Sequence, residues 1–429
     1  MARYDPPMLI DHDFKGFPPL HPPLPLSAIG AQGWQLLRGD LALPLAVLRE
    51  DALRHNLAWM RDFCDARGLS LAPHGKTSLS PELWAMQREA GAWGMSVATA
   101  WQAGQAARHG MSNIIIANQV VQAAELDTLA GLLNRDAALR LWFLVDSLAQ
   151  VERVEAWQLT RGTGQRFDVL LELGLSGQRT GTRDHDEALA LGRRIAASPA
   201  LRLAGLECYE GALATCNDAA DVPAVNALMD RVDALARVLL AAQAFDTDGA
   251  PLILSAGGSS VFDLVAARLQ PDLGVPVRGV LRSGCYLTHD HLHYHRHLQC
   301  MGLRLRQAAT LRPALEVLTA VQSVPEPGLA LLGGGKRDMS FDMDLPLPLW
   351  RARVGDAVTT DAPAHWQISR LNDQHAYLRF DAHAAEAPPR VGELVGLGIS
   401  HPCTTFDKWR WLPLVDRSYR VTGAVTTRF

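Results

Sequence analysis

From about Leu41 onward, short runs of apolar and β-branched residues alternate with longer stretches in which apolar residues recur every three or four positions. The first pattern is typical of buried strands, and the second is typical of amphipathic helices such as Ala188–Ala197 and Val222–Ala242. Because a crossover helix must connect two parallel strands, this alternation predicts a parallel α/β sheet. The predicted strands are Leu43–Leu48, Leu69–Ala72, Met95–Ala98, Asn113–Ala117, Leu141–Val145, Asp168–Leu173, Leu203–Cys208, Leu252–Ser255 and Val277–Leu281.

The number of these strands favours one closed sheet. Eight or nine strands over roughly 240 residues match the size of a (β/α)8 TIM-type barrel. An open doubly wound sheet is the alternative arrangement. In a barrel, catalytic side chains sit on the loops at the C-terminal ends of the strands, so the residues that follow each strand are the candidates for function.

After about His289 the pattern changes to short apolar runs broken by proline and glycine, which predicts a smaller, mainly antiparallel β domain. We therefore expect a barrel over residues 40–288 and a β domain over residues 289–429. An N-terminal arm, residues 1–39, would wrap the second domain through its proline-rich part. The strands expected in the second domain are Ala314–Val321, Leu329–Leu332, Trp366–Leu371, Ala376–Phe380 and Glu393–Leu397.

Composition narrows the class of protein. The chain has 429 residues, 48% of them hydrophobic and 20% charged, which is typical of a folded globular protein. The 41 basic and 45 acidic side chains leave a net charge of −4, and neither sign gathers in a long block. Nucleic acid and anionic membranes are therefore not expected as partners.

The six cysteines are too sparse for a disulfide scaffold and form no CxxC pair, which favours a reducing cytoplasm. The first 20 residues lack the apolar stretch of a secretion signal. No segment reaches the ~20 continuous apolar residues that a membrane span requires. We expect a soluble, cytoplasmic protein.

A lysine stands at the end of the second predicted strand, in Ala72-Pro73-His74-Gly75-Lys76-Thr77. A lysine at the mouth of a barrel can form a Schiff base with an aldehyde, provided that burial or nearby positive charge keeps its amine near neutrality. A solvated surface lysine is the alternative interpretation.

A glycine-rich turn, Ser255-Ala256-Gly257-Gly258-Ser259-Ser260, joins a strand to a helix-like segment. The glycines let backbone amides approach an anion, and the helix start and serine hydroxyls add donors, so the turn suits a phosphate. A serine-capped turn without a ligand is the alternative. One strand later, Arg282-Ser283-Gly284-Cys285-Tyr286 offers a second glycine turn and a phenol.

Near the C-terminus, His401 and Cys403 stand two residues apart. In extended backbone, residues i and i+2 point to the same face, so both side chains can hold one ion. Imidazole with thiolate favours zinc, and two protein ligands leave positions for water or substrate. Core packing is the alternative.

Five histidines occupy alternate positions in the run from His289 to His297. A strand would align them on one face, where they would bind a metal or respond to pH. The alternative is a solvated strand or loop that leaves the barrel.

Together these motifs resemble one family: the D-serine dehydratase and D-threonine aldolase group of alanine-racemase-like, fold-type III enzymes that use pyridoxal 5′-phosphate. The resemblance spans nearly the whole chain. It rests on Pro44–Asn56, Pro73–Thr77, Ala117–Val121, Glu172–Gly174, Gln178–Gly181, Tyr209–Gly211, Ser255–Ser260, Arg282–Tyr286, Leu371–His375 and His401–Cys403.

The resemblance implies roles for these residues. Lys76 would carry the cofactor as a Schiff base and later move the substrate's α-proton. Arg179 would lie by the cofactor's phenolic oxygen, and Tyr209 would line its ring. His401 and Cys403 would be metal ligands, and the enzyme would be a homodimer. The phosphate would be bound by Ser255, Gly257, Gly258, Ser259, Ser260 and Tyr286.

Some positions depart from the family's pattern: Ala72 replaces an arginine, Ser78 replaces a histidine, and the segment Leu332–Lys336 lacks the family's acidic residue. These differences bear on the identity of the substrate rather than on the cofactor chemistry.

The expected reaction is α,β-elimination of a D-β-hydroxy amino acid, D-serine above all, to a 2-oxo acid and ammonia, with zinc on the leaving hydroxyl. Elimination is favoured because the second metal ligand is a soft thiolate. The alternatives are D-threonine aldolase-type retro-aldol cleavage, D-threo-3-hydroxyaspartate dehydration, racemisation and, in a different class, a non-catalytic pyridoxal phosphate carrier.

Overall fold

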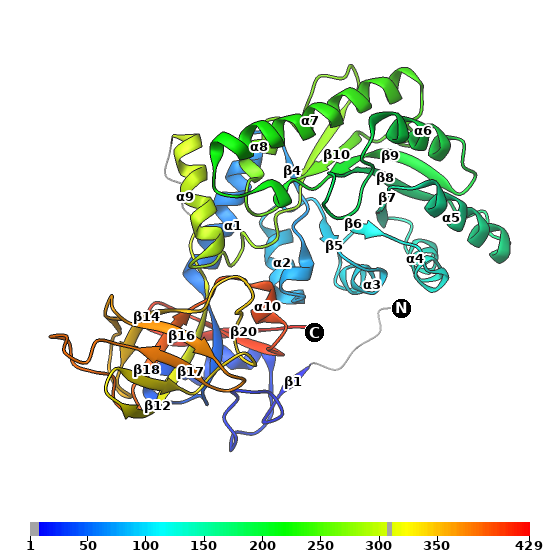
Figure 1. The fold of residues 1–429 in the computed structure, drawn as a ribbon. Helices are drawn as coiled ribbons and strands as arrows, with labels where there is room; N and C mark the ends of the chain where they lie inside the picture. The colour runs from blue at the N-terminus through cyan, green and yellow to red at the C-terminus, as the bar shows by residue number, and fades with distance from the viewer. Residues whose placement is uncertain (1–7, 307–310) are drawn as a thin grey trace.

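The computed structural model of the chain describes residues 8–306 and 311–429. It contains an eight-stranded parallel sheet and a separate, mainly antiparallel sheet (Figure 1). No helix within those residues is both long and apolar enough to span a bilayer.

The parallel sheet is a nearly closed barrel. Its strands follow the order β4-β11-β10-β9-β8-β7-β6-β5, and a parallel bridge between His74 and Ser96 joins its two ends. The barrel interpretation is confirmed and the open sheet is excluded. The strands are β4 (Ser70–Leu71), β5 (Met95–Val97), β6 (Asn113–Gln119), β7 (Arg140–Val145), β8 (Phe167–Leu173), β9 (Leu201–Cys208), β10 (Leu252–Ala256) and β11 (Val277–Leu281).

Helices with one apolar face connect and cover these strands (Figure 1). They bury aliphatic residues at helical spacing against the sheet, as Ala188, Leu191 and Ile195 do in α6. The helices are α1 (Glu50–Asp65), α2 (Pro81–Glu89), α3 (Ala100–Arg108), α4 (Ala123–Arg135), α5 (Leu148–Arg161), α6 (His185–Ala196), α7 (Asp218–Ala241), α8 (Phe262–Ala266) and α9 (His293–Leu305).

The second sheet confirms the predicted antiparallel domain, including all five predicted strands. Four further strands, β14, β15, β19 and β20, were not predicted. The strands of this domain are β12 (Leu315–Glu326), β13 (Leu329–Leu332), β14 (Leu347–Ala352), β15 (Thr360–Asp361), β16 (Gln367–Leu371), β17 (Ala376–Arg379), β18 (Leu394–Gly398), β19 (Trp411–Val415) and β20 (Val421–Thr426), with the short helix α10 (Cys403–Phe406) between β18 and β19.

The first predicted strand does not belong to the barrel. β3 (Leu45–Arg49) pairs antiparallel with β12 and parallel with β19, so it is part of the second sheet. All four of its apolar residues are buried, a pattern that fits either sheet, and the sequence pattern therefore could not choose between them. The domain boundaries at 40–288 and 289–429 stay a prediction.

Residues of the N-terminal arm contact the second domain, although residues 1–7 are outside the described part of the chain; that the arm wraps this domain stays a prediction. β1 (Leu9–Ile10) pairs with β2 (Leu24–Pro25). The ring of Phe17 packs 5.9 Å from that of Trp411, whose indole nitrogen donates to the carbonyl of Lys15 at 2.8 Å.

The histidine run is neither a strand nor a solvated loop. Its second half begins α9, and His289, Asp290 and His297 are buried. The apolar residues of α9, such as Leu298 and Met301, pack into the core and determine helical geometry, which overrides the alternation of the histidines.

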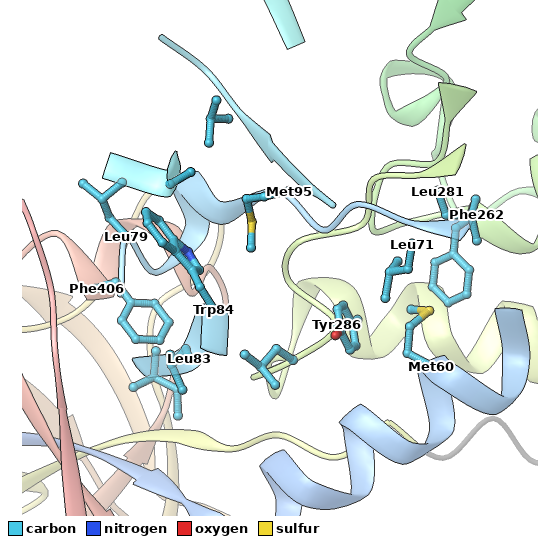
Figure 2. Packing of buried hydrophobic residues seen from close by; sticks show 14 of the residues in the cluster. Met60, Leu71, Leu79, Leu83, Trp84, Met95, Phe262, Leu281, Tyr286 and Phe406 are labelled. Atoms are coloured by element: carbon cyan, nitrogen blue, oxygen red, sulfur yellow. The ribbon is translucent and has the colours of Figure 1, made fainter. Parts of the chain in front are cut away.

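One hydrophobic cluster continues from the barrel into the second domain (Figure 2). Phe406 of α10 lies beside Leu83 and Trp84 of α2, and Leu79 lies next to them. This packing fixes the loop that carries His401 and Cys403 against the end of β4.

Candidate active site

A cavity of about 310 Å³ lies at the C-terminal ends of the barrel strands, where the second domain covers them. Lys76, the glycine turn and the His401–Cys403 pair all line it. Of the residues singled out from the sequence, eight reach the cavity: Lys76, Arg179, Tyr209, Gly257, Gly258, Ser259, His401 and Cys403.

Three residues singled out from the sequence are not among those that line this cavity. The Ser255 hydroxyl donates to the carbonyl of Val280 at 3.2 Å inside the sheet. Ser260 is buried beyond the turn. The ring of Tyr286 packs in the core near Met60 and Leu71 (Figure 2), and its hydroxyl accepts a hydrogen bond from Gln87 at 3.3 Å. The structure therefore does not support Tyr286 as a phosphate ligand.

Lys76 lies in a single 3-10 turn, Gly75–Thr77, directly after β4. The turn is tightly held, because a Cβ at Gly75 would come within 2.7 Å of the Met95 sulfur, and the Trp84 indole donates to the Gly75 carbonyl at 3.2 Å. The Lys76 side chain itself is exposed to the cavity. Burial and the positive charges of Lys76 and two arginines lower the pKa of His74 well below its usual value, so His74 is neutral.

The glycine turn is formed as expected, but its first two amides already have an anionic partner. Gly257, at φ +100°, and Gly258 donate to the two carboxylate oxygens of Glu210 at 3.0 and 2.6 Å. Burial raises the pKa of Glu210, although these amides oppose the shift. The turn binds an anion as its geometry predicted, and that anion is a side chain of the protein.

The remaining donors for a phosphate lie next to this contact. The Ser259 side chain and the turn Ser283-Gly284-Cys285 line the cavity, and the Cys285 amide donates to the Ser259 hydroxyl at 3.2 Å. A Cβ at Gly284 would lie 2.6 Å from the His74 carbonyl and 2.7 Å from the Thr77 hydroxyl. Only glycine permits this close approach, which holds the turn against the segment that carries Lys76.

A buried ion pair at the cavity wall was not predicted. Arg282 donates to Glu207 and, at 2.9 Å, to the carbonyl of Cys208. Burial raises the pKa of Glu207 to about 8, against the attraction of Arg282. The sequence held a signal for this site: Glu207 is an acidic residue near the end of a strand that is otherwise apolar except for Arg202 at its start.

Two further contacts lie at the cavity wall. The Arg179 guanidinium lies 4.2 Å from the ring centroid of Tyr209, within range of a cation–π interaction. Burial, and then Glu210, raises the pKa of Tyr209. Glu172 accepts hydrogen bonds from Gln119 and from Thr180, and burial raises its pKa as well.

His401 and Cys403 enter the cavity from the second domain. The Nδ1 of His401 lies 2.6 Å from one carboxylate oxygen of Asp342, and the other oxygen accepts a hydrogen bond from the Thr404 hydroxyl at 2.8 Å. A proton on Nδ1 leaves the Nε2 lone pair for a metal, an arrangement common in metal sites. The contacts with Cys285 and Thr77 lower the pKa of Cys403 to about 7, although burial opposes this.

These donors fit a metal ion that keeps open positions. Within residues 8–306 and 311–429, no group of three or more histidine, cysteine, aspartate or glutamate side chains is placed to hold one. His401 and Cys403 would therefore hold an ion together with water or substrate, as in a catalytic site. Asp342 had no signal in the sequence, since it stands 59 positions before its histidine.

Comparison with known proteins gives two family matches. The model for "Alanine racemase, N-terminal domain" matches residues 48–294, and that for "Putative serine dehydratase domain" matches residues 314–415. The two matches cover most of the barrel and most of the second domain.

Individual relatives cover most of the chain. A D-threo-3-hydroxyaspartate dehydratase of Delftia sp. is 31% identical over 70% of this chain and 73% of its own length. A 3-hydroxy-D-aspartate aldolase of Paracoccus denitrificans is 27% identical over 73% and 77%. The structure of a D-threonine aldolase from Filomicrobium marinum superposes with a TM-score of 0.74 over 92% of this chain and 97% of that one, at 23% identity.

Proposed function

The chain belongs to the alanine racemase N-terminal domain family, and from this we propose that it is a pyridoxal 5′-phosphate-dependent lyase of D-β-hydroxy amino acids. We propose further that it is a zinc-dependent D-serine dehydratase, which forms a 2-oxo acid and ammonia. One observation carries the proposal: Lys76, the Gly257–Ser259 turn and the His401–Cys403 pair line a single cavity.

The cofactor site follows from these donors. Lys76 would hold the aldehyde carbon, while the Ser259 hydroxyl and the turn at Gly284 would bind the phosphate in place of the predicted Gly257 and Gly258 amides. Arg179 and Tyr209, which contact each other, would orient the ring. When bound, pyridoxal phosphate supplies an electron sink for a bond broken at Cα of the attached amino acid.

Lys76 is the group that moves the Cα proton. Its side chain is exposed in the cavity and extends from a turn that Gly75 and Trp84 hold in place. The backbone of Lys76 is therefore fixed, while its amine can move within the cavity. A general base must reach the proton that it removes, and among the described residues Lys76 is the one lysine that lines this cavity. Tyr294 of α9 and Met343 of the second domain also line the cavity.

His401 and Cys403 would hold zinc at the side of the cavity that faces Lys76. Bound there, the ion would supply a Lewis acid for the β-hydroxyl, which is a poor leaving group. The match of residues 314–415, which carry both side chains, to a putative serine dehydratase domain supports elimination.

Retro-aldol cleavage is the second candidate. It is favoured by the similarity to a 3-hydroxy-D-aspartate aldolase and, at 26% identity over 85% of this chain, to a D-threonine aldolase of Arthrobacter sp.. The same side chains would serve both reactions, because the bond that lies perpendicular to the cofactor ring decides which one breaks.

A substrate panel separates these reactions. The protein is incubated with D-serine, D-threonine and D-threo-3-hydroxyaspartate, with the L-enantiomers as controls, and ammonia, 2-oxo acid, aldehyde and glycine are measured. We expect ammonia and 2-oxo acid in equal amounts from D-serine. Aldehyde and glycine without ammonia would establish the aldolase instead, and interconversion of enantiomers alone would reject both lyases.

The cofactor is tested separately by absorbance. The protein supplied with pyridoxal phosphate should develop a visible band that borohydride removes, and Lys76→Ala should not develop it. A wild-type protein without this band would reject the pyridoxal proposal regardless of the substrate panel.

A further inference from the structure

Two cysteines from different domains face each other inside the cavity. Cys285 follows β11 of the barrel, and Cys403 begins α10 of the second domain, 118 positions later. Their sulfur atoms are 3.8 Å apart, and both line the cavity. The Thr77 hydroxyl lies 3.8 Å from the first sulfur and 3.5 Å from the second.

We infer that Cys285 and Cys403 form an oxidative modification site that closes to an intramolecular disulfide on reaction with a peroxide. A thiolate attacks the peroxide oxygen and becomes a sulfenic acid while one water leaves, and the second thiol displaces the sulfenic oxygen as another water. Two thiols and one hydrogen peroxide therefore give one disulfide and two waters.

The geometry permits this bond with a small movement. A disulfide needs sulfur atoms about 2.0 Å apart, so the present 3.8 Å must shorten by about 1.8 Å. Cys285 is the fixed partner, since its amide donates to Ser259 and its carbonyl accepts from the His289 amide at 2.7 Å. Cys403 is half-buried at the start of a four-residue helix, so its side chain is the one that turns.

Position at the cavity also distinguishes this pair from the other cysteines. Cys64 and Cys208 are as buried as Cys285, at 3%, 1% and 4% exposure, but they do not line the cavity. Cys216 is exposed, but its sulfur lies 3.2 Å from His297 Nδ1, outside the cavity and near Cys300. Only Cys285 and Cys403 line the cavity that a small peroxide enters.

The disulfide would change the protein in two ways. It would join the barrel to the second domain inside the cavity, and it would consume the Cys403 sulfur. The second effect rests on the proposed function, because it predicts loss of the zinc that His401 and Cys403 hold. The bond itself does not depend on that function.

The test uses the full-length protein as isolated, with its bound cofactor and metal, and a second sample treated with a chelator. Each is exposed to stoichiometric hydrogen peroxide, the free thiols are counted, and a non-reducing digest is analysed by mass spectrometry. We expect two of the six thiols to disappear and a peptide linking Cys285 to Cys403 to appear in at least one sample, and dithiothreitol to reverse both changes.

Variants make this result specific. Cys285→Ser should abolish the linked peptide. If this variant does not fold, Cys403→Ser, at a half-buried position, is used in its place and should also abolish the linked peptide. The matched control, Cys216→Ser combined with Cys300→Ser, should keep the link. A link between Cys216 and Cys300 alone, or Cys403 oxidised without Cys285 in both samples, would overturn the inference.

The metal content is read independently. If the disulfide forms and zinc is released, both the modification and the metal site are supported. If the disulfide forms in a protein that never binds zinc, the modification stands and the metal part of the proposed function fails.

Discussion

The two ends of the barrel hold similar residue types, yet the C-terminal end leaves a lysine exposed in its cavity. The C-terminal end has the cavity of about 310 Å³, with Lys76 exposed in it and acidic groups whose pKa values burial has raised. The N-terminal end has a smaller cavity of about 170 Å³, lined by two tryptophans, arginines and acids. Polar and charged residues line both cavities.

At the N-terminal end the polar groups satisfy one another. Arg202 lies 2.6 Å from Asp168, and Arg278 donates to the Ser70 hydroxyl at 3.0 Å. The rings of Trp93 and Trp142 pack 5.6 Å apart. These contacts are typical of a stabilising end of a barrel rather than of a binding site.

The difference shows that a reactive side chain exposed in a cavity identifies the functional end of the barrel better than the volume or the charge of the cavity does. A cation that already has a carboxylate is poorly available to a ligand, whereas an exposed amine beside a neutral histidine is available. Four experiments test this difference between the two ends, beginning with the largest expected effect.

Lys76→Ala should reduce lyase activity by about 10³-fold or more, because in the proposed function Lys76 is both the covalent attachment point and the base. The melting temperature should stay unchanged, since the side chain is exposed. Activity and thermal unfolding are measured together with those of Arg278→Ala from the opposite end, which should keep its activity. A loss of activity in Arg278→Ala would show that the two ends are coupled.

Asp342→Asn should weaken zinc binding by about 10–100-fold, because the carboxylate orients His401 through Nδ1. The zinc dissociation constant, measured by competition with a chelator, is the readout. The control is Asp344→Asn, whose carboxylate contacts Arg296 at 2.8 Å instead. Equal affinities of the two variants would contradict a positioning role for Asp342.

Arg202→Gln should lower the free energy of unfolding by about 1–3 kcal/mol, because Asp168 is left largely buried without its cation. Catalytic rates should not change, as this pair lies at the opposite end of the barrel. Arg166→Gln breaks a more exposed ion pair with Asp246 and should cost less than about 1 kcal/mol. Denaturant unfolding measures both, and an equal cost would refute the importance of burial here.

His289→Asn should make stability less dependent on pH between about pH 4 and 6.5. Burial, then His295 and His291, lowers the pKa of His289 to about 3, so the unfolded chain binds a proton that the folded protein does not. Stability therefore falls as pH falls below about 6.5 in the wild type.

Removing this group should reduce the slope by up to roughly 1.4 kcal/mol per pH unit. The opposite shift of Asp290, whose pKa burial raises to about 7, is present in both proteins and cancels in the comparison. The exposed His383→Asn serves as control, and urea unfolding across this range is the measurement. An unchanged slope in His289→Asn would show that His289 gains its proton in the folded state.

Much of the fold was predictable because it depends on local periodicity. Eight barrel strands and five strands of the second sheet agree with the predicted ranges, since each buries a run of apolar residues that the pattern reveals directly. β3 was assigned to the wrong sheet because its buried apolar residues suit either one. The prediction for the histidine run was wrong because its histidines recur every two residues, as in a strand, whereas the apolar residues of α9 are spaced as in a helix.

The candidate site was predictable where a residue follows a strand and unpredictable where distant segments meet. Lys76 and the glycine turn stand directly after strands, so the barrel rule placed them in one cavity. Tyr286 follows a strand as well, yet its ring turned into the core beside Met60. Glu207 and Asp342 were missed, because their partners stand far away in the chain.

The sequence by itself determined the order of the elements, the glycines that allow tight turns, and the residues that can carry the chemistry, because these depend on nearby positions. Only the tertiary structure decided that Glu210 takes the first amides of the glycine turn, that Asp342 orients His401 and that Cys403 faces Cys285. Such contacts depend on how two separately formed sheets pack together, and no local pattern in the chain specifies that packing.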